Sequence, residues 1–296
     1  SGAEANEAAI KLARRAPPAG RYKLITMEKS FHGRTYGAMS ATAQSKTHAG
    51  NEPLLAGFTY APFNDLAAVE AAIDDETAGI MVEPIQGEGG VNLPAEGYLR
   101  GLRDLCDRNQ MVLIFDEVQT GCGRTGTWFG HQRFGVMPDI MTLAKGLGDG
   151  APIGAIVARP EVAAKLTPGS HAATYGANPL VVSAAIATLE AIEAEGMLEN
   201  AVQVGRHIVE KIEDMAGRCD LIAGVRGLGM MIGVELKAPG AKIVGEALAA
   251  GLRINCTQET VLRMLPAMNI TREQVDEGLA ILERVMTDFQ ERGEKT

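Results

Sequence analysis

Lys145 is a single cation placed between an apolar run and a glycine-rich turn. The run is DIMTL at 139–143 and the turn is GLGDG at 146–150. A lysine at the end of a strand can reach solvent through its long stem. A lysine held in an apolar site instead has a lowered pKa and becomes a nucleophilic amine. Which of the two applies depends on the groups that the fold brings to this lysine.

Asp116 stands at the end of another apolar run, MVLIF at 111–115. A carboxylate in that place can cap a turn or a helix. Beside a lysine it has a second use, because pyridoxal phosphate enzymes need both groups. The lysine forms a Schiff base with the cofactor and, once the substrate has displaced it, moves the proton. The carboxylate keeps the pyridine nitrogen protonated, so that the ring accepts electrons when a proton leaves the substrate.

Two further segments could hold such a cofactor. The chain opens with SGAEANE, in which Gly2 and Ala3 would begin a helix whose free N–H groups bind a phosphate. A capping serine followed three residues later by Glu4 explains the same letters. In SFHGRT, Phe31 could stack on a pyridine ring, and Arg34 could bind a carboxylate through its planar fork. The alternative for this second pair is a core aromatic and a surface arginine.

Alternating strands and helices must position these groups. Strands buried on both faces are expected at 22–27, 78–82, 111–115, 140–143 and 153–157. Amphipathic helices are expected at 65–73, 96–109 and 178–195. This alternation predicts an α/β fold with a mostly parallel sheet flanked by helices. Ligands of such folds bind beyond the carboxyl ends of the strands, where both Asp116 and Lys145 fall.

After about residue 195 the pattern changes to that of a smaller α+β domain. Helices are expected at 198–215, 241–250 and 271–290, separated by the strand segments VRGLGMMIGVELK, LRINC and VLRMLPA. We therefore predict a large cofactor-binding domain at 1–195, incomplete at its N-terminus, and a small C-terminal domain at 196–296.

The composition excludes several classes of protein. Of the 296 residues, 46% are hydrophobic and 22% are charged, as in a globular protein. A net charge of −9 argues against nucleic acid or an anionic membrane as a partner. The four cysteines form no CxxC pair, which predicts free thiols in a reducing, cytoplasmic compartment and no disulfide framework or metal site. No apolar run approaches the length of a membrane span, and none resembles a signal peptide. Because the chain begins at Ser1 without a methionine, we expect an N-terminal segment to be missing.

Six motifs occur in the order found in class III aminotransferases, which are pyridoxal phosphate enzymes of fold type I. They are SGAEANE, SFHGRT, EPIQGEGGV, FDEVQTGCGRTG, TLAKGLGDGAPIGA and HAATYGANPL. Within that class the chain is most similar to the acetylornithine aminotransferases, in FHGRT, in YAPFNDLAAVEAAI and in EPIQGEGGVN. The resemblance implies transfer of an amino group from N2-acetyl-L-ornithine to 2-oxoglutarate, a step of arginine biosynthesis. It also implies a homodimer whose two subunits share their active sites.

The resemblance assigns eight residues to the cofactor. They are Gly2 and Ala3 at the phosphate, Phe31 over the ring face, Asp116 at the ring nitrogen, Val118 below the ring, Gln119 beside the phenolic oxygen, Lys145 as the Schiff-base lysine, and Thr174 at the phosphate of the neighbouring subunit's cofactor.

The substrate site that the resemblance implies takes its residues from three of the motifs and from VLRMLP. They are Arg34, Glu83, Glu88, Ala173 and Arg263. Arg34 is expected to contact acetylornithine, and Arg263 a carboxylate, with Glu88 as the counter-ion that releases it. The alternative for these last two charges is an ordinary surface ion pair. Ala173 stands where most of the group have a hydroxyl residue, which removes one possible substrate contact.

Two other classes of function remain open at this point. Relatives that use 4-aminobutyrate, ornithine, succinylornithine or a carrier-bound lysine share these cofactor motifs, so only pocket residues separate them. A non-catalytic protein could also keep the fold without the chemistry. That second class requires damage to the lysine, the aspartate or the phosphate site, and none is visible.

Overall fold

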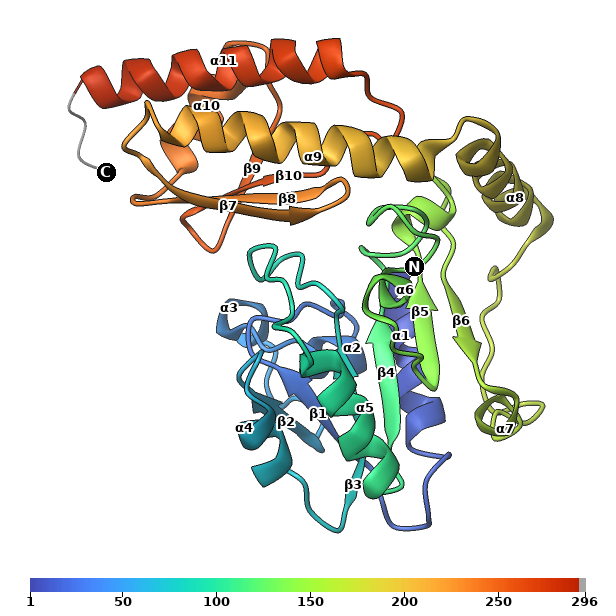
Figure 1. Cartoon of the computed structure of the whole chain (residues 1–296). Helices are drawn as coiled ribbons and strands as arrows, with labels where there is room; N and C mark the ends of the chain where they lie inside the picture. The colour runs from blue at the N-terminus through green and yellow to red at the C-terminus, as the bar shows by residue number, and fades with distance from the viewer. Residues whose placement is uncertain (293–296) are drawn as a thin grey trace. The chain divides into compact units, whose positions relative to one another are not determined.

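The computed structural model describes residues 1–292, and the chain divides into two compact units (Figure 1). The first unit comprises residues 1–86, 94–122 and 127–192. The second comprises 87–93, 123–126 and the chain from Glu193 onward. It therefore includes two short segments that the sequence pattern placed in the large domain.

The first unit is built on a six-stranded sheet. Its strands are β1 (Lys23–Met27), β2 (Phe58–Ala61), β3 (Thr77–Val82), β4 (Val112–Asp116), β5 (Ile140–Leu143) and β6 (Ala155–Ala158), in the order β2-β1-β3-β4-β5-β6. The pairs from β2 to β5 are parallel, whereas β6 runs antiparallel to β5. The mostly parallel sheet predicted from the alternating pattern is confirmed.

Helices cover both faces of this sheet, which explains the continuous apolar runs of its central strands. The helical elements are α1 (Gly2–Ala13), α2 (Tyr36–Ala41), α3 (Ser45–His48), α4 (Leu66–Ala71), α5 (Tyr98–Arg108), α6 (Gly130–Phe134), the 3₁₀ turn η1 (Lys145–Leu147), α7 (Pro160–Ala163) and α8 (Pro179–Ala194). Leu113 and Phe115 of β4 join one core cluster with α5, while Ile114 joins another with α1. Figure 1 shows α5 and α1 on opposite sides of the sheet.

The two edge strands are where the sequence-based expectations fail. The sequence pattern missed β2, whose Thr59 and Tyr60 are exposed. The expectation that 153–157 is buried on both faces is wrong, because Val157 of β6 is 52% exposed. Each strand has only one neighbour in the sheet, so neither needs an unbroken apolar sequence.

The second unit is a smaller α+β structure, as its sequence predicts. It contains α9 (Met197–Ala216), β7 (Ile222–Leu228), β8 (Met231–Leu236), α10 (Ala241–Ala249), β9 (Asn255–Thr257), β10 (Val261–Met264) and α11 (Arg272–Glu291). The strands pair antiparallel in the order β7-β8-β10-β9. Apolar side chains of all three helices and of three strands form one core. None of the helices in residues 1–292 is both long enough and apolar enough to span a membrane.

Candidate active site

Three neighbouring parallel strands bring the two predicted catalytic residues and one predicted substrate-binding residue, Glu83, to one edge of the first sheet. β4 ends at Asp116, while Glu83 follows β3 and Lys145 follows β5 by two residues. Asp116 pairs in register with Thr142 of β5. Because parallel strands present their carboxyl ends at the same edge, these three side chains start from one rim of the sheet.

Four donors surround the buried carboxylate of Asp116. Its Oδ2 accepts hydrogen bonds from Asn6 Nδ2 and His32 Nδ1, each at 2.8 Å. Its Oδ1 accepts the Val118 amide at 3.0 Å and the Thr142 hydroxyl at 3.3 Å. The four groups come from α1, from the segment after β1, from the turn after β4 and from β5, so the carboxylate is fixed from several directions.

These donors decide the charge of Asp116. Burial alone would raise the pKa of this carboxyl group, since it disfavours the charged form. The hydrogen bond and charge of His32, with the bonds from Val118 and Asn6, outweigh burial and hold the pKa of Asp116 below its ordinary value. A carboxylate with this surrounding is ionised at neutral pH and suits a protonated ring nitrogen.

Lys145 is exposed, although the strand that leads to it is buried. The chain leaves β5 through buried Ala144 and enters η1 at Lys145, whose φ is 45°. The carbonyl of Lys145 accepts the amides of Gly148 and Asp149 at 3.1 and 3.2 Å. A lysine buried at the strand end is therefore not what the structure has, because the turn directs this residue out of the core.

The start of α1 packs directly against the strand ends. A Cβ at Gly2 would lie 2.9 Å from Val118 Cγ1 and 3.5 Å from the Cβ of Ala144. Only a glycine lets the backbone approach this closely. Ser1 also caps the helix, because its hydroxyl accepts the Glu4 amide in a capping box. The same residues thus show both features: the helix cap of the alternative interpretation, and the close backbone approach that an anion site needs.

Phe31 and Arg34 contact each other in the segment between β1 and α2. The Arg34 guanidinium lies 5.8 Å from the centre of the half-buried Phe31 ring, and Arg34 itself is exposed. The Phe31 amide donates to Oε2 of buried Glu83 at 3.2 Å. Oε1 of Glu7 accepts the Thr35 hydroxyl at 2.6 Å and two amides of α2. Arg34 is thus a surface arginine, as the alternative has it, whereas Phe31 is only half-buried, and the roles of both residues stay predictions.

Ala173 and Thr174 make no contact that joins them to the cluster around Asp116 within residues 1–292. Both are exposed, on the segment between α7 and α8. Among residues 1–292, no hydrogen bond joins either of them to the residues around Asp116. Gln119 is half-buried in the turn after β4. The roles of these three residues stay predictions.

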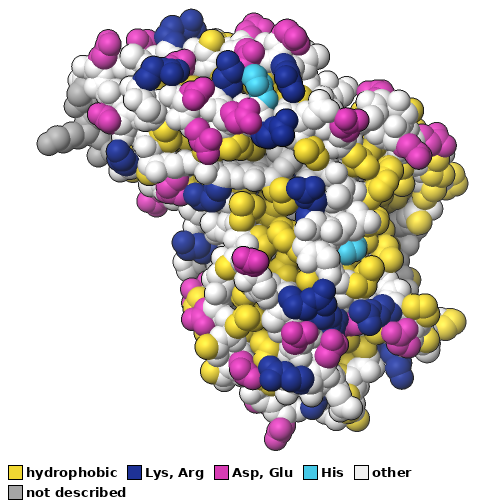
Figure 2. All heavy atoms as spheres, in the orientation of Figure 1, with side chains coloured by type: hydrophobic (Ala, Val, Ile, Leu, Met, Phe, Trp, Pro, Cys, Tyr) yellow, Lys and Arg dark blue, Asp and Glu magenta, His cyan; other side chains and the backbone are white. Residues whose placement is uncertain are grey.

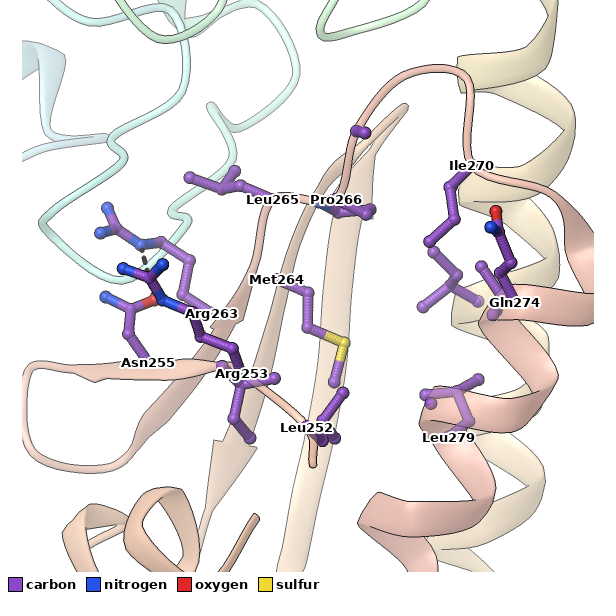
Figure 3. Close-up of a pocket in the computed structure, with 15 residues that line it drawn as sticks. Leu252, Arg253, Asn255, Arg263, Met264, Leu265, Pro266, Ile270, Gln274 and Leu279 are labelled. Carbon is purple, nitrogen blue, oxygen red and sulfur yellow. Dashed lines mark hydrogen bonds between the residues drawn. The ribbon is translucent and has the colours of Figure 1, made fainter. Parts of the chain in front are cut away.

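A charged pair of the second unit joins Arg263 to Glu88. Arg263 Nη1 lies 2.7 Å from Glu88 Oε1, and the arginine side chain is 9% exposed against 33% for the glutamate. Arg263 Nε donates to Asn255 Oδ1 on the paired strand at 3.4 Å (Figure 3). A pocket of about 610 Å³ adjoins this strand pair, lined on its other side by apolar residues of α9 and α11. Because its arginine is buried, this is not an ordinary surface pair.

The segment that carries Glu88 is held in place through its backbone. Thr257 Oγ1 and Gln258 Nε2 both donate to the Glu88 carbonyl. Arg226 of β7 donates to the carbonyls of Gly90 and Val91 at 2.6 to 3.1 Å. These bonds explain why residues 87–93 belong to the second unit, and they leave the Glu88 side chain to pair with Arg263.

Sequence reasoning missed the residues that support the predicted ones. Asn6, Glu7 and His32 lie within SGAEANE and SFHGRT, so the motifs marked their neighbourhood but not their roles. Glu117 is a further case, because its buried carboxylate accepts the Gly130 amide and both the amide and Nδ1 of His131. The only signal in the sequence was that these polar residues stand inside the motifs. Their hydrogen-bond partners lie far away along the chain, so the sequence does not reveal them.

Comparison with known proteins decides the family. The family model described as "Aminotransferase class-III" matches residues 1–286. The chain belongs to the class III aminotransferases. It is 49% identical over 294 residues to the acetylornithine aminotransferase of Caldanaerobacter subterraneus subsp. tengcongensis, which covers 98% of this chain and 75% of that protein.

Solved structures agree with this family. The ornithine aminotransferase from Toxoplasma gondii, reported with partial occupancy of PLP at its active site, matches with a TM-score of 0.94 at 32% identity, over 99% of this chain and 72% of its own. N-acetylornithine aminotransferase from Stenotrophomonas maltophilia K279a matches with a TM-score of 0.84 at 35% identity, over 99% and 74%. The fold of a pyridoxal phosphate transaminase is confirmed.

The residues of the first unit fit pyridoxal phosphate, the cofactor of class III aminotransferases. An ionised carboxylate is buried at the end of β4, and an exposed lysine follows the end of β5. The first turn of α1 packs against Val118 and Ala144, which are close to this carboxylate and this lysine in the sequence. An anion-binding helix start, a carboxylate and an amine are the three groups that this cofactor requires. Within residues 1–292, no cluster of three or more His, Cys, Asp or Glu side chains could hold a metal ion.

Proposed function

We propose that the protein transfers the amino group of N2-acetyl-L-ornithine to 2-oxoglutarate, giving N-acetyl-L-glutamate 5-semialdehyde and L-glutamate, in arginine biosynthesis. One observation carries the chemistry, namely the ionised Asp116 carboxylate on the same sheet edge as Lys145. The choice of donor is supported by the 49% identity to an acetylornithine aminotransferase. The free cysteines support a reducing compartment, and we place the protein in the cytoplasm.

The residues of the first unit divide the work between charge and proton transfer. When bound, pyridoxal phosphate takes up the electron pair that is released as the substrate carbon loses its proton. Asp116 supplies the negative charge that keeps the ring nitrogen protonated. Nζ of Lys145 binds the cofactor and then moves the proton of the carbon that bears the transferred amino group. The first amides of α1, at Gly2 and Ala3, hold the phosphate.

The charged residues outside this centre distinguish the two substrates. The amino donor has a neutral acylated tail, whereas the acceptor is a dicarboxylate. Arg263 binds a carboxylate through its planar fork, and Glu88 is its counter-ion when the acceptor is absent. Arg34, already oriented against Phe31, serves the acylated donor.

A comparison of donors tests this proposal directly. Steady-state rates with 2-oxoglutarate are measured for acetylornithine, ornithine, succinylornithine and 4-aminobutyrate. Acetylornithine is expected to have the highest kcat/KM. A higher value for one of the other donors would reassign the substrate within the family, and no transfer from any donor would support the non-catalytic alternative.

Substitutions at Arg34 and Glu88 are expected to have different effects. Arg34→Lys keeps the charge but loses the fork, so kcat/KM for acetylornithine should fall about 10- to 100-fold, the range of one charge-assisted hydrogen bond. Glu88→Gln removes the partner of Arg263 and should weaken discrimination between donors of different tail charge. Single-turnover rates with each donor measure both effects, with exposed Arg272→Lys as the control. Parent-like rates in both variants would contradict the substrate assignments.

We also propose a homodimer that covers α8. This helix is rich in apolar residues, yet Leu180 is 79% and Ile186 52% exposed, and Tyr175 just before it is 84% exposed. Figure 2 shows hydrophobic side chains gathered over this region, at the right of the view. The exposed Ala173 and Thr174 adjoin the same surface, which supports a site shared between subunits.

Leu180→Glu is therefore expected to shift the protein from dimer to monomer, because it places a charge in the apolar contact. Sedimentation velocity measures the change. Leu248→Glu, on α10 with 62% exposure, is the matched control and should leave the dimer intact. A parent protein that sediments as a monomer at all concentrations would contradict the shared site.

A further inference from the structure

The two neighbours of Arg34 in the chain both contact α1, the helix whose first amides we assign to the cofactor phosphate. Gly33, before it, has a φ of 138°, and a Cβ there would lie 2.7 Å from the Cβ of Ala3. Thr35, after it, donates its hydroxyl to Glu7 Oε1 at 2.6 Å. Ala3 and Glu7 are four positions apart, so they lie on one face of α1. The backbone of Arg34 is therefore attached to this helix face on both sides.

Glu7 caps α2 in place of the N-cap residue of that helix. Thr35 occupies the N-cap position, yet its side chain makes no capping bond. Instead Oε1 of Glu7 accepts the amides of Gly37 and Ala38, the second and third residues of α2, at 2.8 and 3.1 Å. An N-cap side chain normally satisfies one of these two amides. A threonine can make such a bond by itself, so a cap for α2 does not require Glu7.

Gly37 leaves the space that the Glu7 carboxylate occupies. A Cβ at residue 37 would overlap Oε2 of Glu7 and lie 2.8 Å from its Cδ. Within a helix, glycine is less favourable than alanine. A residue that disfavours the helix thus stands at the point where the Glu7 carboxylate contacts α2. This choice is explained by the contact with Glu7 and not by the stability of the helix.

We propose that Glu7 is a positioning residue that fixes Arg34 relative to α1 and thereby determines how tightly the amino donor binds. A second carboxylate, Glu83, accepts the Phe31 amide at 3.2 Å and holds the other end of the segment. Because the Arg34 guanidinium lies over the Phe31 ring, a shift of the backbone at Thr35 changes the place of the guanidinium. This inference rests on the proposed function for the role of Arg34 and on the contacts above for its geometry.

The first test follows backbone hydrogen exchange in the protein without cofactor or substrate. Glu7→Ala removes the acceptor of two amides, of which Thr35 can satisfy only one, so exchange at the start of α2 should be about tenfold faster. Glu7→Gln keeps one accepting oxygen and should restore most of the protection. Glu70→Ala, which breaks an exposed ion pair of the same unit, is the matched control and should leave this exchange unchanged.

The second test compares the two half-reactions by single-turnover kinetics. Glu7→Ala should weaken the apparent binding of acetylornithine about tenfold and change the limiting rate much less, because Arg34 binds the donor before and during the reaction alike. The half-reaction with 2-oxoglutarate should stay unchanged, since Arg263 binds that substrate instead. A general loosening of the fold would slow both half-reactions. Glu7→Gln should again restore most of the binding of the donor.

A second variant breaks the same contact from the side of α2. Gly37→Ala displaces the Glu7 carboxylate, which is the free end of a flexible side chain, so the fold can accommodate the methyl group. Because alanine also favours the helix, the variant should be no less stable than the parent. We nevertheless expect the same selective weakening of acetylornithine binding. Loss of donor binding without loss of stability distinguishes positioning from a merely structural role.

A double-mutant cycle shows whether Glu7 acts through Arg34. In the Arg34→Lys background, Glu7→Ala should have almost no further effect on acetylornithine binding. Parent-like donor binding in Glu7→Ala and Gly37→Ala, equal losses in both half-reactions, or losses that multiply in the Arg34→Lys background would overturn the inference. A parent protein without amino transfer from any donor would overturn the proposed function instead, and hydrogen exchange would still decide whether Glu7 holds this segment.

Discussion

Replacing Lys145 by alanine is expected to stop amino transfer almost completely while the fold is kept. The side chain is exposed, so its removal leaves no cavity in the core. The variant loses both the amine that binds the cofactor and the base that moves the proton. General acid–base catalysis alone contributes about 10²- to 10⁴-fold, so the combined loss should exceed that range.

Chemical labelling identifies the lysine independently of rate. Parent protein with cofactor should absorb in the visible range, and borohydride reduction followed by peptide mapping should place the label on Lys145. Lys165, close after α7 and likewise exposed, provides a Lys165→Ala control with unchanged labelling. A label on any other lysine would reject the assignment of Lys145, whatever the rate of the alanine variant.

The central strands could be predicted from sequence because both of their faces are buried. Leu113 and Phe115 face one helical layer and Ile114 the other, so the positions of β4 that precede Asp116 must be apolar. The edge strands β2 and β6 lack this requirement. β6 is half-exposed and antiparallel to β5, and no run of apolar residues reveals either property.

For the site, the sequence predicted only which types of residue take part and that they stand at the ends of strands. Asp116 and Lys145 were recognisable because each follows an apolar strand. The exposure of Lys145 depends on the φ of 45° at the start of η1, which the letters do not specify. The bonds of Asp116 to Asn6 and His32 join residues separated by 110 and 84 positions, a relation that only the folded chain establishes.

The boundary between the two units shows the same limit. Residues 87–93 follow a strand of the first sheet, and nothing in their composition separates them from it. They belong to the second unit because Arg226, Thr257 and Gln258 bond to their carbonyls. Backbone hydrogen bonds of this kind depend on tertiary structure, so they leave no periodic signal in the sequence.

Asp116→Asn is the second substitution for which we expect a loss of several orders of magnitude in the half-reaction. An amide cannot keep the ring nitrogen protonated, and an unprotonated ring accepts electrons poorly. The change also affects stability, because all four contacts of Asp116 are with donors. The Asn side chain has one accepting oxygen, so its NH₂ group must face donors. We expect the free energy of unfolding to fall by about 1–3 kcal/mol.

The pH dependence of this stability loss separates the charge from the shape of the side chain. Because the pKa of Asp116 is lowered on folding, the ionised carboxylate stabilises the parent at pH values above its unfolded pKa. That contribution disappears as the pH falls through the folded pKa. The difference between parent and Asp116→Asn in urea unfolding should therefore be largest near neutral pH and shrink in acid. Asp276→Asn, at an exposed His–Asp pair, is the control and should show a smaller difference. A difference for Asp116→Asn that stays constant down to pH 3, together with normal turnover, would mean that this aspartate is only a structural cap.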